Sequence, residues 1–189
     1  KDFVPKMVEQ LKEDLQLKSS PRKIEAFDIS HLGGTNTVAS MVSFFDGKPK
    51  KNEYRKFNIK TVEGIDDFAS IREVVFRRYS RVKKEGLGFP DLILIDGGKG
   101  QLSMAVSALR ELGLEYITVI GIAKRLEEVF VPGHSDPQNI PKSSSGLILL
   151  RRIRDEAHRF AITFQRTKRK KTSLKSVFDD IAGMGPSRV

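Results

Sequence analysis

The spacing of hydrophobic residues predicts strands first and then an alternation of helices and strands. In residues 1–20 the apolar positions recur at helical spacing and end at a Ser-Ser-Pro breaker, which predicts a short amphipathic helix and a linker. Three strand-like runs follow at 24–31, 37–45 and 53–61, separated by segments with the Gly, Asn and Asp residues of hairpin turns. Three strands joined by short turns predict an antiparallel meander.

After the meander the apolar period changes to three or four residues. Residues 66–84 predict a helix with an acidic first turn, and the wholly apolar run at 92–95 predicts a strand covered on both faces. The remaining expected elements are a helix at 101–112, a strand at 116–122, an extended piece at 128–131, a surface loop at 132–146 and a long helix at 147–171. This order is that of an α/β ribonuclease H-like fold: a mixed five-stranded sheet of three antiparallel and then parallel strands, flanked by helices.

Composition narrows the class of protein. The chain has 34 Lys and Arg against 24 Asp and Glu, a formal net charge of +10, which favours a polyanion such as nucleic acid, although a solvated basic face is the alternative. The absence of cysteine excludes disulfides and thiolate metal sites. No apolar run approaches the roughly 20 residues of a membrane span, and no signal peptide is recognised. We expect a cytoplasmic fragment of a longer protein, with no membrane partner.

Two aspartates close apolar strand-like runs, Asp28 in IEAFDISH and Asp96 in DLILID. The first and fourth strands of the expected fold are neighbours, so both carboxylates can hold one Mg²⁺ or Mn²⁺ for phosphodiester hydrolysis. Alternatively, Asp28 accepts hydrogen bonds from the following GGT turn and Asp96 caps the next helix. The string GGKGQ after Asp96 allows close approach of a phosphate, with Lys99 as a cation. It is not a P-loop, because Ile93 and Gly100 stand at two of the required positions.

The basic run RRIRDEAHRFA supplies a third candidate, His158. Helical spacing gathers Arg151, Arg154, Asp155 and His158 on one side, while an apolar face would pack on the sheet. Such a helix can present imidazole and guanidinium groups to a phosphate, or it can be a solvated arginine-rich face. Because imidazole is neutral where a further carboxylate would be charged, we expect one cation rather than two, with His158 as a ligand or a proton-transfer group.

Three strings resemble one known family. FDISHLGGTNTVASMVSFFDGKPKKNEYRKFNIK, DLILIDGGKGQLSMA and LLRRIRDEAHRFAITFQRTKRKK are similar to the C-terminal endonuclease half of UvrC, the incision subunit of bacterial nucleotide excision repair. The resemblance covers roughly residues 20–189. It implies a triad of Asp28, Asp96 and His158 that makes the incision on the 5′ side of a lesion. It also implies a functionally sensitive aspartate at Asp66 or Asp67; we favour Asp67, although an N-cap role would explain either.

The resemblance divides the chain into a connector helix and linker (1–20), an endonuclease domain (21–172) and the truncated start of a helix-hairpin-helix DNA-binding domain (173–189). Expected partners are damaged double-stranded DNA and, through a segment of the full-length protein outside this chain, UvrB; the fragment itself is expected to be a monomer. The basic run RTKRKK suits sequence-independent phosphate contact, or else a solvated linker. The expected DNA-binding residues are Lys99, Arg151, Arg152, Arg154, Arg159, Lys168, Arg169, Lys170, Lys171, Gly183 and Gly185. The alternative function is a non-catalytic DNA-binding scaffold of the same fold.

Overall fold

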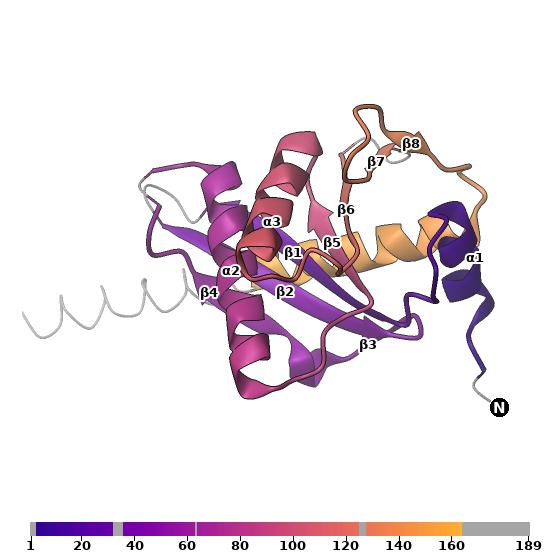
Figure 1. Cartoon of the computed structure of the whole chain (residues 1–189), viewed down its shortest axis with the longest axis horizontal. Helices are drawn as coiled ribbons and strands as arrows, with labels where there is room; N and C mark the ends of the chain where they lie inside the picture. The colour runs from indigo at the N-terminus through magenta and orange to yellow at the C-terminus, as the bar shows by residue number, and fades with distance from the viewer. Residues whose placement is uncertain (1–2, 32–35, 63, 125–127, 164–189) are drawn as a thin grey trace, which may run out of the picture.

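The computed structural model describes residues 3–31, 36–62, 64–124 and 128–163 and shows a mixed sheet between two layers of helices (Figure 1). The strands are β1 (Lys23–His31), β2 (Thr37–Phe45), β3 (Lys48–Pro49), β4 (Arg55–Asn58), β5 (Leu92–Asp96), β6 (Val119–Ile122), β7 (Glu128–Phe130) and β8 (Gln138–Asn139). The helices are α1 (Lys6–Asp14), the short 3-10 helix η1 (Lys51–Glu53), α2 (Asp67–Glu85), α3 (Lys99–Glu111) and a helix over residues 145–163, called here the His158 helix.

The strand order confirms the predicted fold class. β1 is antiparallel to β2 and β2 to β4, whereas β1 is parallel to β5 and β5 to β6, so the first predicted strand lies beside the fourth. The sheet is wider than expected, because the short strands β3, β7 and β8 add to the five predicted ones. The third predicted strand is shorter than 53–61, since its first residue belongs to η1. Within the described ranges, no helix is both long and apolar enough to cross a membrane.

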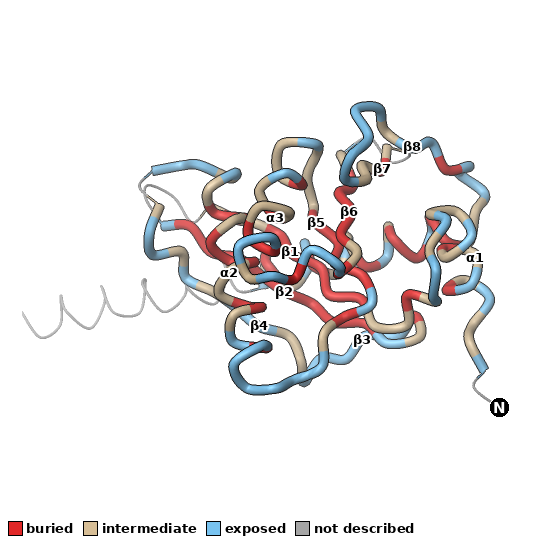
Figure 2. The backbone as a smooth tube through the Cα atoms, viewed as in Figure 1, coloured by how far each residue is buried: buried red, intermediate tan, exposed pale blue. Residues whose placement is uncertain are grey.

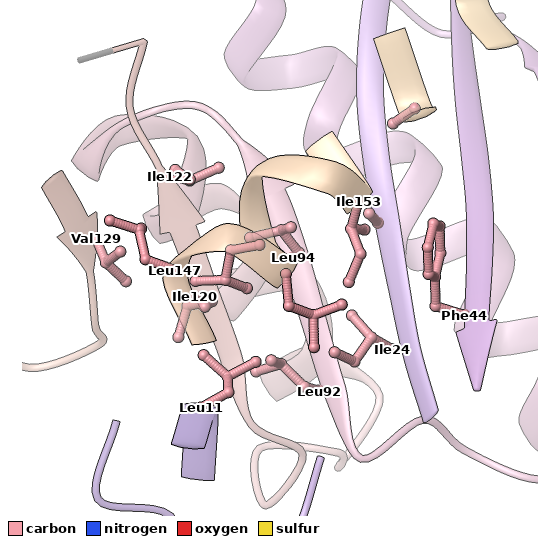
Figure 3. Packing of buried hydrophobic residues seen from close by; sticks show 14 of the residues in the cluster. Leu11, Ile24, Phe44, Leu92, Leu94, Ile120, Ile122, Val129, Leu147 and Ile153 are labelled. Atoms are coloured by element: carbon pink, nitrogen blue, oxygen red, sulfur yellow. The ribbon is translucent and has the colours of Figure 1, made fainter. Parts of the chain in front are cut away.

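Each face of the sheet carries its own hydrophobic core, because successive strand residues point to opposite faces. Ile24 and Ala26 of β1 pack with α1 and the His158 helix, as Figure 3 shows for part of this cluster. Phe27, between them and Asp28, packs with α2 and α3 on the other face. The central strands are buried along most of their length, as Figure 2 shows, so a charged side chain on them needs a specific partner.

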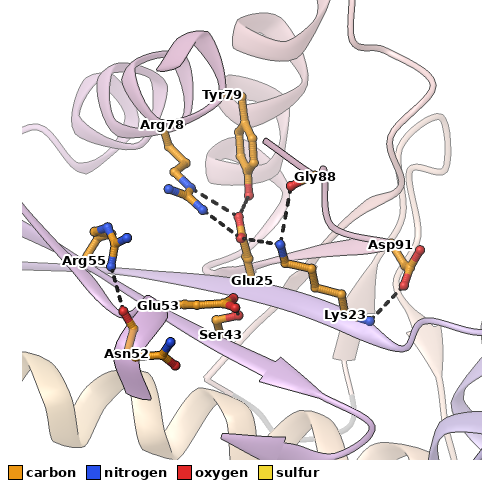
Figure 4. A network of polar contacts seen from close by, with 10 residues as sticks. All are labelled: Lys23, Glu25, Ser43, Asn52, Glu53, Arg55, Arg78, Tyr79, Gly88 and Asp91. Atoms are coloured by element: carbon orange, nitrogen blue, oxygen red, sulfur yellow. Dashed lines mark hydrogen bonds and ion pairs between the residues drawn. The ribbon is translucent and has the colours of Figure 1, made fainter. Parts of the chain in front are cut away.

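A buried charge network joins α2 to β1 (Figure 4). Glu25 is fully buried, and its carboxylate accepts hydrogen bonds from Arg78 Nη2 at 2.9 Å and Tyr79 Oη at 2.7 Å. Burial and then the charge of Glu25 raise the pKa of Tyr79 well above its ordinary value, so the phenol remains a donor. Removing Arg78 or Glu25 would leave the charge of the other buried without compensation, so this network stabilises the contact between α2 and β1.

The predicted N-terminal helix, α1, packs against the beginning of the His158 helix. Leu11 is fully buried in the cluster beneath that helix. Gly146 allows this contact, since a Cβ there would lie 2.8 Å from Leu11 Cα. Ser144 Oγ accepts from Gly146 N at 3.1 Å, as an N-cap does, and donates to Asp14 of α1. The start of the His158 helix is therefore fixed by a residue that α1 holds in place.

Candidate active site

The sheet register places the two predicted aspartates next to each other. Phe27 of β1 pairs with Ile95 of β5 in parallel register, so Asp28 and Asp96 occupy the next positions along neighbouring strands. The alternate residues that precede both aspartates lie in the core beneath the His158 helix. Both carboxylates therefore point to the face of the sheet that this helix covers. The spatial neighbourhood expected from the strand order is present.

Asp28 is a buried carboxylate without a hydrogen-bonding partner for one of its oxygens. The residue is 6% exposed, and within the described part of the chain its Oδ2 accepts no hydrogen bond. Burial and then the charge of Asp96 raise the pKa of Asp28 to about 7, while His158 acts in the opposite direction. An unpartnered buried acceptor costs free energy. The GGT turn of the alternative interpretation lies outside the described residues, so the structure does not test that alternative.

Asp96 lies at the carboxyl end of β5 and does not cap the helix that follows. The N-cap of α3 is Gly98, whose backbone N–H donates to Gln101 Oε1 at 3.2 Å. Burial raises the pKa of Asp96, while a hydrogen bond with Asp28 and then the charges of Arg154, His158 and Lys124 act in the opposite direction. The capping alternative is therefore excluded for this aspartate. Its carboxylate is a charge at a strand end, where open α/β sheets bind ligands.

His158 completes the cluster from the helix above. Its Nδ1 lies 3.6 Å from Asp28 Oδ2, and its side chain is 65% exposed, so the imidazole faces both the buried carboxylate and solvent. The helix is held in place by a fully or almost fully buried apolar face: Leu147, Leu149, Leu150, Ile153, Ala157 and Ala161. The structure thus brings Asp28, Asp96 and His158 together, as the sequence predicted.

The donors in this cluster fit a hard divalent cation. Carboxylate oxygens are the ligands that Mg²⁺ prefers, Mn²⁺ accepts imidazole as well, and the unpartnered Oδ2 of Asp28 has lone pairs available. Asp28 and Asp96 would hold the ion, with His158 within reach at the exposed side. Among the described residues, no group of three or more His, Cys, Asp or Glu side chains lies close enough together to hold a metal ion. The two carboxylates alone would leave the other coordination positions of a bound cation to water and a phosphate.

The arginines of the His158 helix divide between its two flanks. The charge of Arg154 acts to lower the pKa of Asp96, so its guanidinium is within electrostatic reach of that carboxylate. Arg152 instead donates to Gly47 O at 3.4 Å, and Arg159 donates to both oxygens of Glu156 at 2.7 Å. These two arginines line a groove with Phe44 and Pro49 on the β2–β3 side.

Asp155, expected beside His158, lines the same β2–β3 groove, although it also accepts from Arg154 Nη2 at 3.1 Å. Arg151 is half-buried, and Lys99 is exposed at the first residue of α3. The other expected DNA-binding residues lie outside the described residues: Lys168, Arg169, Lys170, Lys171, Gly183 and Gly185.

The structure gives the two candidate aspartates before α2 different partners. Asp66 is the N-cap of α2, and its Oδ1 accepts from Ala69 N at 3.1 Å. Asp67 Oδ1 lies 2.7 Å from His31 Nε2, at the end of β1. The sequence interpretation missed His31, which stands in the same FDISH string as Asp28. The available signal was its place three residues after Asp28, which puts it on the opposite face of the strand.

A glycine in β6 allows that strand to pass close to the turn after Asp96. Gly97 N donates to Ile122 O at 2.9 Å, and a Cβ on Gly121 would lie 2.8 Å from Gly97 O. Backbone atoms cannot yield as a flexible side chain can. The position of the Asp96 turn therefore depends on the missing side chain at Gly121.

We expect Gly121→Ala to destabilise the protein by about 1–3 kcal/mol, because the methyl group forces β6 away from the Asp96 turn. Urea unfolding measures this change. Gly88→Ala is the matched control, since a Cβ there meets nothing within 4 Å and its φ is not positive. Equal stability of Gly121→Ala and the unmodified protein would show that the close approach is not strained.

Two known proteins are similar in sequence over most of this chain. UvrABC system protein C of Christiangramia forsetii is 56% identical over 187 residues, which are 98% of this chain and 31% of that protein. The protein of the same name from Methanococcus maripaludis is 58% identical over 168 residues, 89% of this chain and 32% of that protein. The chain thus spans about a third of the length of these relatives.

A solved structure of Ciona intestinalis endonuclease V bound to inosine-containing DNA aligns with a TM-score of 0.41 and 21% identity, over 70% of this chain and 59% of that one. A likeness this distant carries no argument about function. The family model described as the UvrC RNase H endonuclease domain matches residues 12–162, which contain Asp28, Asp96 and His158. The chain therefore belongs to the UvrC family and contains its RNase H endonuclease domain.

Proposed function

We propose that this chain is a metal-dependent DNA endonuclease domain that makes the 5′ incision beside a lesion in nucleotide excision repair. The observation that carries the proposal is a pair of carboxylates, buried Asp28 and half-buried Asp96, at adjacent positions of parallel strands, with His158 Nδ1 at 3.6 Å from Asp28 Oδ2. The family supports the nuclease class. Incision on the 5′ side, the partner UvrB and the lesion are parts of the proposal that come from the family resemblance and not from the geometry of the site.

Each group of the site has a chemical role in this proposal. Asp28 and Asp96 hold one Mg²⁺ or Mn²⁺, which when bound activates a water molecule and neutralises charge on the scissile phosphate. His158, exposed to solvent, either completes the ligand set or transfers a proton to or from the reacting oxygen. Arg154, beside Asp96, stabilises negative charge that develops on the phosphate.

The remaining partners follow from charge and from the family. The net charge of +10 favours DNA by contacts with phosphates, so binding would be independent of sequence and would weaken steeply with salt. UvrB would bind through a segment of the full-length protein outside this chain, and the domain itself would act as a monomer in the cytoplasm. The scaffold alternative requires Asp28 and Asp96 to cap or brace the fold; two observations favour the nuclease instead, since Gly98 is the N-cap of the helix after Asp96 and Asp28 Oδ2 accepts no hydrogen bond among the described residues.

Cation binding tests the proposal without requiring the incision complex. We expect Mn²⁺ to raise the melting temperature of this chain, because a ligand that binds only the folded state stabilises it. The double variant Asp28→Asn/Asp96→Asn should lose this effect, whereas Asp136→Asn, an exposed aspartate of the loop before β8, should retain it. Stabilisation that survives in the double variant would rule out the nuclease site, and two fully occupied cations in anomalous diffraction would contradict the single-ion form.

A further inference from the structure

We propose that the first turn of α2 holds the two active-site strand ends at their working separation, with Asp67 and Phe68 as positioning residues. Asp67 acts on the strand of Asp28 through His31, and Phe68 acts on the turn after Asp96 through Gly100. This inference rests on the proposed function, since it concerns the spacing of the same two carboxylates. In this proposal Asp67 supports the position of the strand end and does not itself bind the cation.

The side of the sheet separates Asp67 from the active-site carboxylates. Phe27 and Ile29 of β1 pack against the core formed by α2 and α3, and His31 points to the same face because it is two residues further. Asp28 points to the other face, beneath the His158 helix. Asp67 therefore reaches β1 from the face opposite to the carboxylate that would hold the metal.

The contact with His31 closes the end of the first hairpin. His31 and Thr37 are paired residues at the ends of β1 and β2. The imidazole uses both nitrogens: Nε2 lies 2.7 Å from Asp67 Oδ1 and Nδ1 lies 3.1 Å from Thr37 Oγ1. A carboxylate can only accept, so Nε2 carries the proton of this bond. The helix N-terminus further favours a negative charge at Asp67, the first residue of α2.

The next residue of α2 reaches the other strand end. The ring of Phe68 lies where a Cβ on Gly100 would stand, so the aromatic ring contacts the backbone of the first turn of α3. Gly100 is four residues after Asp96 and follows the Gly97-Gly98 turn. Two consecutive residues of α2 thus touch both segments that carry the carboxylates, one through a hydrogen bond and one through van der Waals contact.

Small displacements of these segments should have large effects on cation binding. A divalent cation requires its oxygen ligands within a few tenths of an ångström of their preferred distances. Misplacement of a site group by about 1 Å can reduce activity about 100-fold. The Asp67–His31 pair is partly exposed, with 46% and 26% of the two side chains accessible, so its removal should disturb alignment more than overall stability.

The experiment compares two neighbouring aspartates. We expect Asp67→Ala to weaken Mn²⁺ binding by the whole chain at least tenfold by titration calorimetry, and Asp67→Asn, which retains an acceptor for His31, to recover most of it. Asp66→Ala, which removes the N-cap of the same helix, is the matched control and should bind within twofold of the unmodified protein. Phe68→Ala should weaken binding in the same direction as Asp67→Ala. Amide hydrogen exchange of residues 29–31 without metal should accelerate in Asp67→Ala and not in Asp66→Ala.

Three results would overturn the proposal. Unchanged Mn²⁺ affinity in Asp67→Ala would show that the contact between Asp67 and His31 does not align the two carboxylates. Equal losses in Asp66→Ala and Asp67→Ala would show that both act through helix stability. If the unmodified chain binds no Mn²⁺, the proposed function fails, and hydrogen exchange alone decides the positioning role: equal exchange in Asp67→Ala and the unmodified chain would then reject it.

Discussion

Replacement of Asp28 by asparagine should abolish DNA incision and, in the absence of divalent cations, make the protein more stable. The loss of activity should be at least about 10³-fold, because one of the two carboxylates that we propose to hold the metal disappears. The gain in stability follows from the cost of an ionised carboxylate that is buried beside Asp96. A residue that is only structural would show the opposite sign.

The pH dependence gives this prediction a distinct form. Burial and Asp96 raise the folded-state pKa of Asp28 from 3.8 to about 7, so the folded protein binds a proton more tightly than the unfolded chain does. Stability from this group is therefore complete below pH 4 and decreases as pH rises toward 7. The full loss is on the order of 4 kcal/mol, because a rise from 3.8 to about 7 converts at about 1.4 kcal/mol per pKa unit, and Asp28→Asn should lack it.

Chemical denaturation at pH 5 and pH 8, with a chelator present, measures this difference. Asp28→Asn should exceed the unmodified protein in free energy of unfolding mainly at pH 8. Asp46→Asn is a control for which the expected change in stability has the opposite sign. Hydrogen bonding to Arg22 lowers the pKa of Asp46, so its charge stabilises the fold at pH values above the ordinary pKa of aspartate, and the variant should be less stable there. If Asp28→Asn is less stable than the unmodified protein at pH 8, Asp28 has a structural partner and its assignment to the metal is wrong.

His158→Ala should reduce incision by about 10² to 10⁴-fold, the usual contribution of a positioned proton-transfer group. The imidazole is the exposed member of the cluster and contacts Asp28 Oδ2 at 3.6 Å, so it can meet substrate where the carboxylates cannot. Incision assays with the full-length protein and its partners measure this loss. Ile148→Ala is the control on the same helix, because the Ile148 side chain is exposed and belongs to neither the site nor the expected DNA-binding residues, and it should change activity much less.

The Mn²⁺ affinity of His158→Ala separates the two roles left open for this residue. A proton-transfer group can be removed with the cation affinity within about twofold of normal, whereas removal of a ligand reduces it about tenfold or more. Addition of free imidazole should restore part of the activity in the first case. Full incision by His158→Ala would exclude both roles.

The sequence was most informative where local pattern and long-range structure agree. The strand predicted at 37–45 coincides with β2, because its apolar residues and flanking turns are local signals. The adjacency of Asp28 and Asp96 followed from strand order, which depends on the succession of elements and not on individual contacts. Helical periodicity placed His158 on the side of its helix opposite the buried apolar residues, whereas its role in the site was implied by the family resemblance.

Features that depend on contacts between distant segments were not predicted. β8 lies in a loop rich in Pro and Ser and exists only because Gln138 and Asn139 pair with β7. The bond between His31 and Asp67 joins residues far apart in sequence, and no local pattern marks either as the partner of the other. Helical spacing placed Arg154 with His158 and apart from Arg152 and Arg159, but it could not show that Arg152 and Arg159 have partners of their own, Gly47 O and Glu156.

The contact between α1 and the His158 helix couples the position of α1 to the position of the His158 imidazole. Asp14 holds Ser144, Ser144 caps the helix, and Leu11 lies against Gly146 at the same point. A helix transmits a displacement of one end to the other, because its backbone hydrogen bonds make it stiff along its axis. A displacement of α1 would therefore also displace His158, although most of the sequence lies between them.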